Sequence, residues 1–107
     1  MSVPEIDVQE LARRHGDGAV ILDVRNPDEY EQGHVPGAIL IPLGEIQDRV
    51  AEVPTECTVH VVCAMGGRSR KAAEFLVSCG IDAINVSGGT VAWIEAGLPV
   101  VAGSDPE

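Results

Sequence analysis

Short apolar runs rich in β-branched residues alternate with helical segments along the chain, and this alternation constrains its fold more than any other feature. Continuous apolar runs of this length are typical of strands covered on both faces, as in a parallel sheet. The alternation therefore predicts an α/β domain with a largely parallel sheet. The predicted strands are AVILDV at 19–24, AILIPL at 38–43, TVHVVC at 58–63 and AINV at 83–86.

The segments around these runs carry residues that start and stop helices. Asp7 is placed to cap the first helix, with Glu10 at the spacing of a capping box. Asn26 followed by Pro27 marks the start of the second helix. Cys79 falls on the apolar stripe of its helix, which predicts a small buried hydrophobe. The predicted helical segments are 6–14, 26–33, 44–53, the stretch from Ser69 to Cys79, and 90–97, in which Trp93 is expected to be core.

The length and charge of the chain limit its organisation and its partners. With 107 residues it is expected to form one domain over 1–107, with a core at 3–101 and a loose tail at 102–107. The net charge of −10 argues against nucleic acid and anionic membranes as partners. No apolar run reaches the about 18 residues of a membrane span. The N-terminus lacks the features of a secretory signal, so we expect a cytoplasmic protein.

The three cysteines, Cys57, Cys63 and Cys79, are an odd number without paired spacing, which fits a reducing compartment better than a disulfide framework. Together with the histidines they lack the spacing of a zinc site, so neither a metal nor another cofactor is expected. Cys57 lies in a polar stretch with no neighbouring cation, and we interpret it as structural or incidental. The sequence leaves open whether it takes part in a thiol relay.

Cys63 differs from the other cysteines in its position on the chain and in the residues after it. It ends a predicted buried strand, and ligands in open α/β sheets bind at the carboxyl ends of strands. Gly66 and Gly67 let the backbone curl tightly, so that its N–H groups form a nest for an anion. The next helix adds N-terminal N–H groups, and Arg68 adds a permanent charge. These surroundings predict a thiol with a depressed pKa.

A thiolate that is formed by its surroundings can attack without a partner base. His60 lies three residues earlier on the same strand, so its side chain is expected on the face opposite Cys63, which argues against a Cys–His pair. The loop after Cys63 is suited to hold an anion, whether a thiolate, a persulfide or an oxyanion of a substrate.

Three blocks of the sequence together resemble the single-domain rhodaneses, a family of sulfurtransferases. The blocks are ILDVRNPDEYEQGHVPGAILIPL at 21–43, VVCAMGGRS at 61–69 and VSGGTVAWIEAGLPV at 86–100. They keep the order and spacing of the family, so the resemblance covers nearly the whole chain. It implies a rhodanese-like α/β fold, a parallel sheet of about five strands with helices on both faces.

The resemblance also implies a mechanism. Cys63 would attack the outer sulfur of thiosulfate or a related donor, expel sulfite and hold a persulfide, which a thiol, cyanide or a protein acceptor then removes. Arg68 would meet the anionic donor. The family places Asp23 and Arg25 among residues that organise loops near the site. We interpret His34 as a hydrogen-bonded turn residue rather than a catalyst. The loop that would stabilise the persulfide comprises Ala64, Met65, Gly66, Gly67, Arg68 and Ser69.

One departure from the family pattern comes directly after the cysteine. Many relatives carry a cation there, whereas this chain has Ala64 and Met65. That leaves Arg68 as the main charge within the loop and allows a less polar donor or acceptor.

Two other functions are also compatible with the sequence. Cysteine-loop phosphatases and arsenate reductases also close their loop with an arginine, but their loop is one residue longer. With four residues between Cys63 and Arg68, a phosphate should be crowded. The other alternative is a non-catalytic binding module of the same fold, against which the retained cysteine, glycines and arginine argue.

Overall fold

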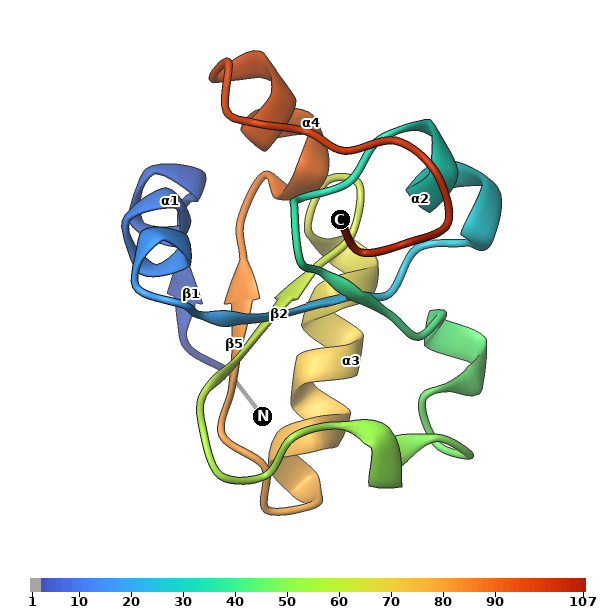
Figure 1. Ribbon diagram of the computed structural model, residues 1–107. Coiled ribbons are helices and arrows are strands. Elements are labelled where there is room, and N and C mark those ends of the chain that lie inside the picture. The colour runs from blue at the N-terminus through green and yellow to red at the C-terminus, as the bar shows by residue number, and fades with distance from the viewer. Residues whose placement is uncertain (1–2) are drawn as a thin grey trace.

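The computed structural model describes residues 3–107 and shows a five-stranded parallel sheet with helices on both faces (Figure 1). The strands lie in the order β1-β5-β4-β2-β3, and each neighbouring pair is parallel. The strands are β1 (Glu5–Ile6), β2 (Val20–Asp23), β3 (Ile39–Leu40), β4 (Val59–Val62) and β5 (Ala83–Val86). The helices are α1 (Val8–Gly16), α2 (Pro27–Gln32), α3 (Gly67–Ser78) and α4 (Gly89–Glu95), with 3₁₀ turns η1 (Leu43–Glu45) and η2 (Val50–Glu52).

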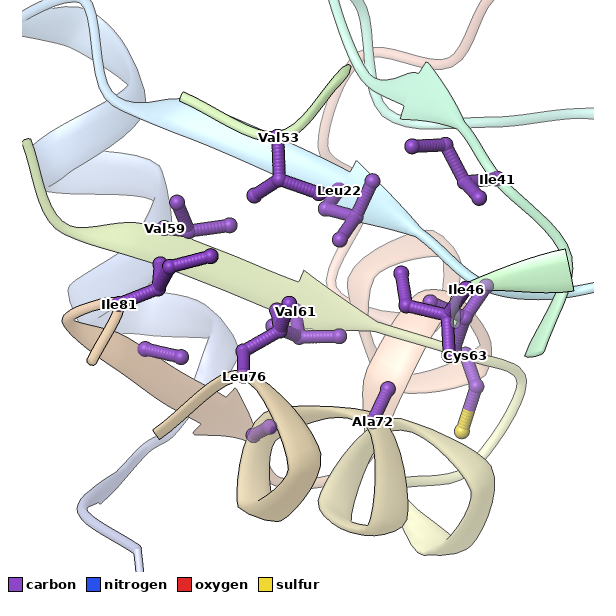
Figure 2. Packing of buried hydrophobic residues seen from close by; sticks show 13 residues of the cluster. Leu22, Ile41, Ile46, Val53, Val59, Val61, Cys63, Ala72, Leu76 and Ile81 are labelled. Carbon is purple, nitrogen blue, oxygen red and sulfur yellow. The ribbon is translucent and has the colours of Figure 1, made fainter. Parts of the chain in front are cut away.

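Alternation along the strands divides the core into two clusters, one on each face of the sheet. On one face, Val59 and Val61 of β4 pack with Ala72 and Leu76 of α3 (Figure 2). On the other face, Val62 packs with residues of α1, α2 and α4, and the fully buried Trp93 belongs to this second cluster. The prediction of a core tryptophan is therefore confirmed.

The two predicted helix starts are confirmed by their hydrogen bonds. The Asp7 side chain accepts from the backbone N–H of Glu10 at 2.9 Å, which caps α1. At α2, the carboxylate of Glu29 accepts from the backbone N–H of Asn26 at 3.1 Å, with Pro27 in the first turn.

The predicted helix over 44–53 is wrong, because this segment forms the two short 3₁₀ turns η1 and η2. It lies between Pro42 and Pro54 and includes Gly44, so it is too short and too flexible to sustain an α-helix by itself. Burial of Ile46 and Val53 against the cluster on the α3 face fixes the turns instead.

Two other details differ from the prediction. Cys79 is exposed rather than buried, because α3 ends at Ser78 and Cys79 forms its C-cap, beyond the buried stripe that Leu76 completes. The fifth strand is β1, a two-residue edge strand directly before the Asp7 cap, which is too short to produce an apolar run. The predicted strand at 38–43 is shortened to Ile39–Leu40.

The C-terminal residues 102–107, expected to be loose, are exposed but make hydrogen bonds to α2 and the segment after it. The Pro106 carbonyl accepts from the backbone N–H of Gly37 at 2.9 Å, and Gly103 N–H donates to the Glu31 carbonyl at 2.8 Å. None of the helices within residues 3–107 has the length and apolarity that crossing a membrane requires.

Candidate active site

Cys63 lies directly after β4, at the carboxyl end of a central strand of the sheet. Its side chain extends from the strand toward α3, and the residue is only 1% exposed (Figure 2). Gly66 takes φ +115° and serves as the N-cap of α3, which begins at Gly67, two residues earlier than expected. The positive φ requires glycine in practice, and it brings the helix N-terminus close to the sulfur.

The sulfur of Cys63 receives hydrogen bonds from the loop. Gly66 N–H donates to Sγ at 3.0 Å, and Ser69 Oγ lies 3.3 Å from Sγ. Burial raises the pKa of the Cys63 thiol, but hydrogen bonds from the Ser69 hydroxyl and from the backbone N–H groups of Ser69, Gly66 and Met65 outweigh it. The net result is a thiol pKa below its usual value, which favours a thiolate at this position.

The first residues of α4 donate hydrogen bonds to the backbone of the loop after β4. Thr90 N–H donates to the Cys63 carbonyl at 2.8 Å, and Val91 N–H donates to the Ala64 carbonyl at 3.0 Å. Gly89 makes this close approach possible, because a Cβ there would lie 2.4 Å from the Cys63 carbonyl oxygen. The backbone after β4 is therefore fixed by contacts from two helices, α3 and α4.

Arg68, the cation of the loop, is bound to an acidic residue of α2. Its two terminal nitrogens donate to the Glu29 carboxylate at 2.7 and 2.9 Å, a bidentate ion pair that remains about one-third exposed. This pair holds the pKa of Glu29 at about 2 and raises the pKa of Arg68. The charge expected to meet a donor is thus already balanced by a carboxylate.

Asp23 and Arg25 form a buried ion pair at the end of β2. Arg25 Nη2 donates to Asp23 Oδ2 at 2.8 Å and to the Gly33 carbonyl at 2.9 Å, which ties the end of α2 to the sheet. His34 is fully buried and stacks on Tyr30 with ring centroids 3.6 Å apart. Within residues 3–107, neither Asp23 nor His34 makes a hydrogen bond to Cys63.

His60 lies on the α1 side of β4, away from Cys63, as strand alternation predicts. Its Nδ1 lies 2.9 Å from the Val20 carbonyl, and its Nε2 lies 3.2 Å from the Arg14 guanidinium. Cys57 is exposed, in the loop before β4. These positions leave Cys63 as the cysteine that joins the end of a strand to the start of a helix.

Two cavities flank the loop. One, of about 420 Å³, is lined on its loop side by Met65, Gly66 and Gly67. The other, of about 480 Å³, meets the loop at Ala64. It is lined by apolar side chains of α4 and of the segment after it, and also by the polar residues Arg25, Glu29 and Gln32. Met65 itself is 75% exposed, so an uncharged side chain projects from the loop.

The comparison of this sequence with known families agrees with the geometry. The sequence model of the rhodanese-like domain matches residues 7–96. The chain belongs to the rhodanese-like domain family. A solved rhodanese-related protein of Thermoplasma volcanium has the same fold, with a TM-score of 0.87 at 35% identity over 92% of this chain and 97% of that one.

Two relatives of this rhodanese-like chain are named sulfurtransferases. The sulfurtransferase of Allochromatium vinosum is 37% identical over 103 residues, 94% of this chain and 96% of that protein. The thiosulfate sulfurtransferase GlpE of Pseudomonas syringae is 36% identical over 92 residues, 85% of this chain and 84% of that protein. Two further relatives, 36% and 38% identical to this chain, are longer proteins, and the chain spans 51% and 43% of their length. At the level of the family, the chain is therefore related to sulfurtransferase enzymes.

Sequence reasoning missed three polar residues near the rhodanese-like loop: Glu29, Asn85 and Glu5. Asn85 is fully buried, and it is the polar member of the run AINV. Because asparagine is unfavourable inside a strand, this position is a signal that could have identified it. Glu29 and Glu5 carry no comparable local signal, since acidic residues are common at exposed positions of this chain.

Proposed function

We propose that this protein is a sulfurtransferase that carries a sulfane sulfur as a persulfide on Cys63. The observation that supports it best is the position of the Cys63 sulfur, held by Gly66 N–H at 3.0 Å at the start of α3. Donors placed in advance around a charged sulfur stabilise it without reorganisation during the reaction. The lowered thiol pKa has the same origin.

The proposed transfer has two steps. In the first, the Cys63 thiolate attacks the outer sulfur of thiosulfate; a new S–S bond forms, the old S–S bond breaks, and its electron pair leaves with sulfite. In the second, a thiolate or cyanide attacks the outer sulfur of the persulfide, and the Cys63 thiolate is regenerated as leaving group. Both steps conserve charge and need no metal or other cofactor.

The burial of Cys63 supports sulfur transfer over phosphoryl transfer. A residue that is 1% exposed is reached most readily by a single protruding atom, and the outer sulfur of a donor is such an atom. A tetrahedral phosphate needs room for three further oxygens among the loop N–H groups. The four-residue spacing between Cys63 and Arg68 leaves less of that room.

The nature of the donor depends on the charges around the loop. Arg68 is paired with Glu29, and Ala64 and Met65 supply no cation. Thiosulfate, with two negative charges, gains little electrostatic attraction from such a site. We therefore include uncharged or singly charged persulfides among the donors and thiols among the acceptors.

The decisive test is the mass of Cys63 after exposure to a donor. The intact chain should gain about 32 mass units, one sulfur atom, on incubation with thiosulfate or a persulfide donor, and lose them when cyanide is added. The Cys63→Ser variant should gain nothing. Cys57→Ser and Cys79→Ser are the matched controls and should keep the gain. A gain that depends on Cys57 instead would refute the single-cysteine mechanism, and no gain with either donor would refute sulfur transfer itself.

A further inference from the structure

A chain of hydrogen bonds runs from the Cys63 sulfur to an ion pair at the edge of the sheet. Ser69 Oγ lies 3.3 Å from Cys63 Sγ and 2.6 Å from Asn85 Oδ1. Asn85 Nδ2 donates to Glu5 Oε2 at 2.7 Å, and Glu5 also accepts from Arg70. The three inner residues, Cys63, Ser69 and Asn85, are at most 1% exposed. This hydrogen-bonded network is thus shielded from water at the end that holds Cys63.

The register of the sheet creates this alignment. Asn85 of β5 is the parallel partner of Glu5 on β1 and of Val61 on β4. Cys63 lies two residues after Val61, so its side chain leaves the same face of the sheet as that of Asn85. Ser69, in the first turn of α3, lies over that face and contacts both.

The number of protons in this hydrogen-bonded network limits which of its hydrogen bonds can exist at the same time. The Glu5 carboxylate can only accept, so it fixes the Asn85 amide with nitrogen toward Glu5 and oxygen toward Ser69. Ser69 has one hydroxyl proton, while Asn85 Oδ1 and a Cys63 thiolate both need a donor. The two acceptors therefore compete for the same proton.

We infer that Asn85 is a positioning residue that makes the Ser69 hydroxyl a two-position donor, and this inference rests on the proposed sulfur transfer at Cys63. When the sulfur is a thiol, its S–H donates to Ser69 Oγ, and Ser69 donates to Asn85. When the sulfur is a thiolate, Ser69 turns its proton to Sγ. In the persulfide the negative charge moves to the outer sulfur, and the proton returns to Asn85.

The rotation of the Ser69 hydroxyl affects the acidity of the Cys63 thiol. Formation of the thiolate takes the Ser69 proton away from a buried amide oxygen, and leaving such an oxygen without a donor is unfavourable. Asn85 therefore raises the thiol pKa and partly offsets the loop N–H groups. Three ion pairs lie on the surrounding elements: Arg68 with Glu29, Arg25 with Asp23, and Arg70 with Glu5.

The test measures the thiol pKa of Cys63 by the pH dependence of its alkylation with iodoacetamide. Cys57→Ser and Cys79→Ser are introduced first, so that Cys63 is the sole thiol of the protein. In that background, Asn85→Leu keeps the branched shape of the side chain but removes the acceptor, and the pKa should fall by about one unit. Combined with Ser69→Ala, the same Asn85→Leu change should leave the pKa unmoved, because the hydroxyl that links the two residues is gone.

Two results would overturn the inference: a pKa that rises or stays constant in Asn85→Leu, or an equal fall with and without Ser69. Glu5→Ala at the exposed edge provides a second route if Asn85→Leu does not fold. This change frees the Asn85 amide to turn. The pKa of the Cys63 thiol should then fall further in Glu5→Ala when Ser69 is present than when Glu5→Ala is combined with Ser69→Ala. Alkylation needs no sulfur donor, so a failure of the proposed transfer activity would leave this result readable.

Discussion

Arg68 donates two hydrogen bonds to the carboxylate of Glu29, at 2.7 and 2.9 Å, and so joins the first turns of α3 and α2. Glu29 in turn accepts from the backbone N–H of Asn26 at 3.1 Å, which makes one carboxylate both a helix cap and the partner of the loop cation. A dianionic donor must therefore compete with a carboxylate already in place. Both substrate preference and acid stability should depend on this pair.

The first prediction is that Glu29→Gln makes the protein a better user of thiosulfate. Without the carboxylate, the charge of Arg68 is no longer neutralised by a neighbouring residue and can attract the anionic donor. The KM for thiosulfate should therefore fall about three- to tenfold. This is below the about ten- to hundredfold of a buried charged hydrogen bond, since the pair is partly exposed. Steady-state assays with thiosulfate and with an uncharged persulfide should show the change for thiosulfate alone.

Glu31→Gln is the matched control, because it removes one acidic charge from the exposed face of the same helix. It should leave the KM within about twofold, since exposed charges at a distance are screened by salt. Equal gains in Glu29→Gln and Glu31→Gln would mean that only net charge matters.

The second prediction concerns the acid stability of the fold. Arg68 lowers the pKa of Glu29 to about 2, against an ordinary value of 4.5. A carboxyl with a depressed pKa in the folded state stabilises the fold above pH 4.5, and this contribution is lost as the pH falls toward about 2. Urea unfolding at several pH values should show a steeper loss in this window for the natural chain than for Glu29→Gln. Parallel curves would contradict the ion pair.

The third prediction is that Cys63 forms its thiolate at a lower pH than an ordinary cysteine does. Its hydrogen bonds from Ser69 and from the loop N–H groups hold the thiol pKa below its usual value, in spite of burial. In a chain that retains only this cysteine, alkylation measured against pH should give such a value. The same chain unfolded in urea should return to the ordinary pKa, and a folded value at or above it would contradict the role of the loop.

The fourth prediction tests the support that α4 gives to the loop. Gly89 has φ +56°, and a Cβ there would lie 2.4 Å from the Cys63 carbonyl oxygen and 2.7 Å from that of Ala64. Gly89→Ala should therefore cost about 2–3 kcal/mol in urea unfolding and move the loop. Sulfur loading of Cys63 should decline with it.

Gly97→Ala is the control for backbone strain alone. Gly97 has φ +75°, but a Cβ there would meet nothing within 4 Å. It should cost about 1 kcal/mol or less and leave loading intact. Similar losses in both variants would show that the positive φ, rather than the clash with the loop, controls stability.

The sequence by itself determined the parts of the molecule that depend on neighbours along the chain. Apolar runs predicted four of the five strands, Asp7 and Asn26 predicted two helix starts, and the glycines after Cys63 predicted a tight turn into a helix. Local signals were less reliable where packing decides. The segment 44–53 has a helical pattern but lies between prolines, and Cys79 lies one residue past the end of its helix.

Only the tertiary structure decided which partners surround the candidate nucleophile. Glu29 reaches Arg68 across 39 residues of sequence, and Glu5 reaches Asn85 across 80. The order of the parallel strands brings these residues together, and that order is set by packing on both faces of the sheet rather than by any local pattern. A sequence shows that Cys63 has a cation nearby; the fold shows that the cation is already bound to a carboxylate.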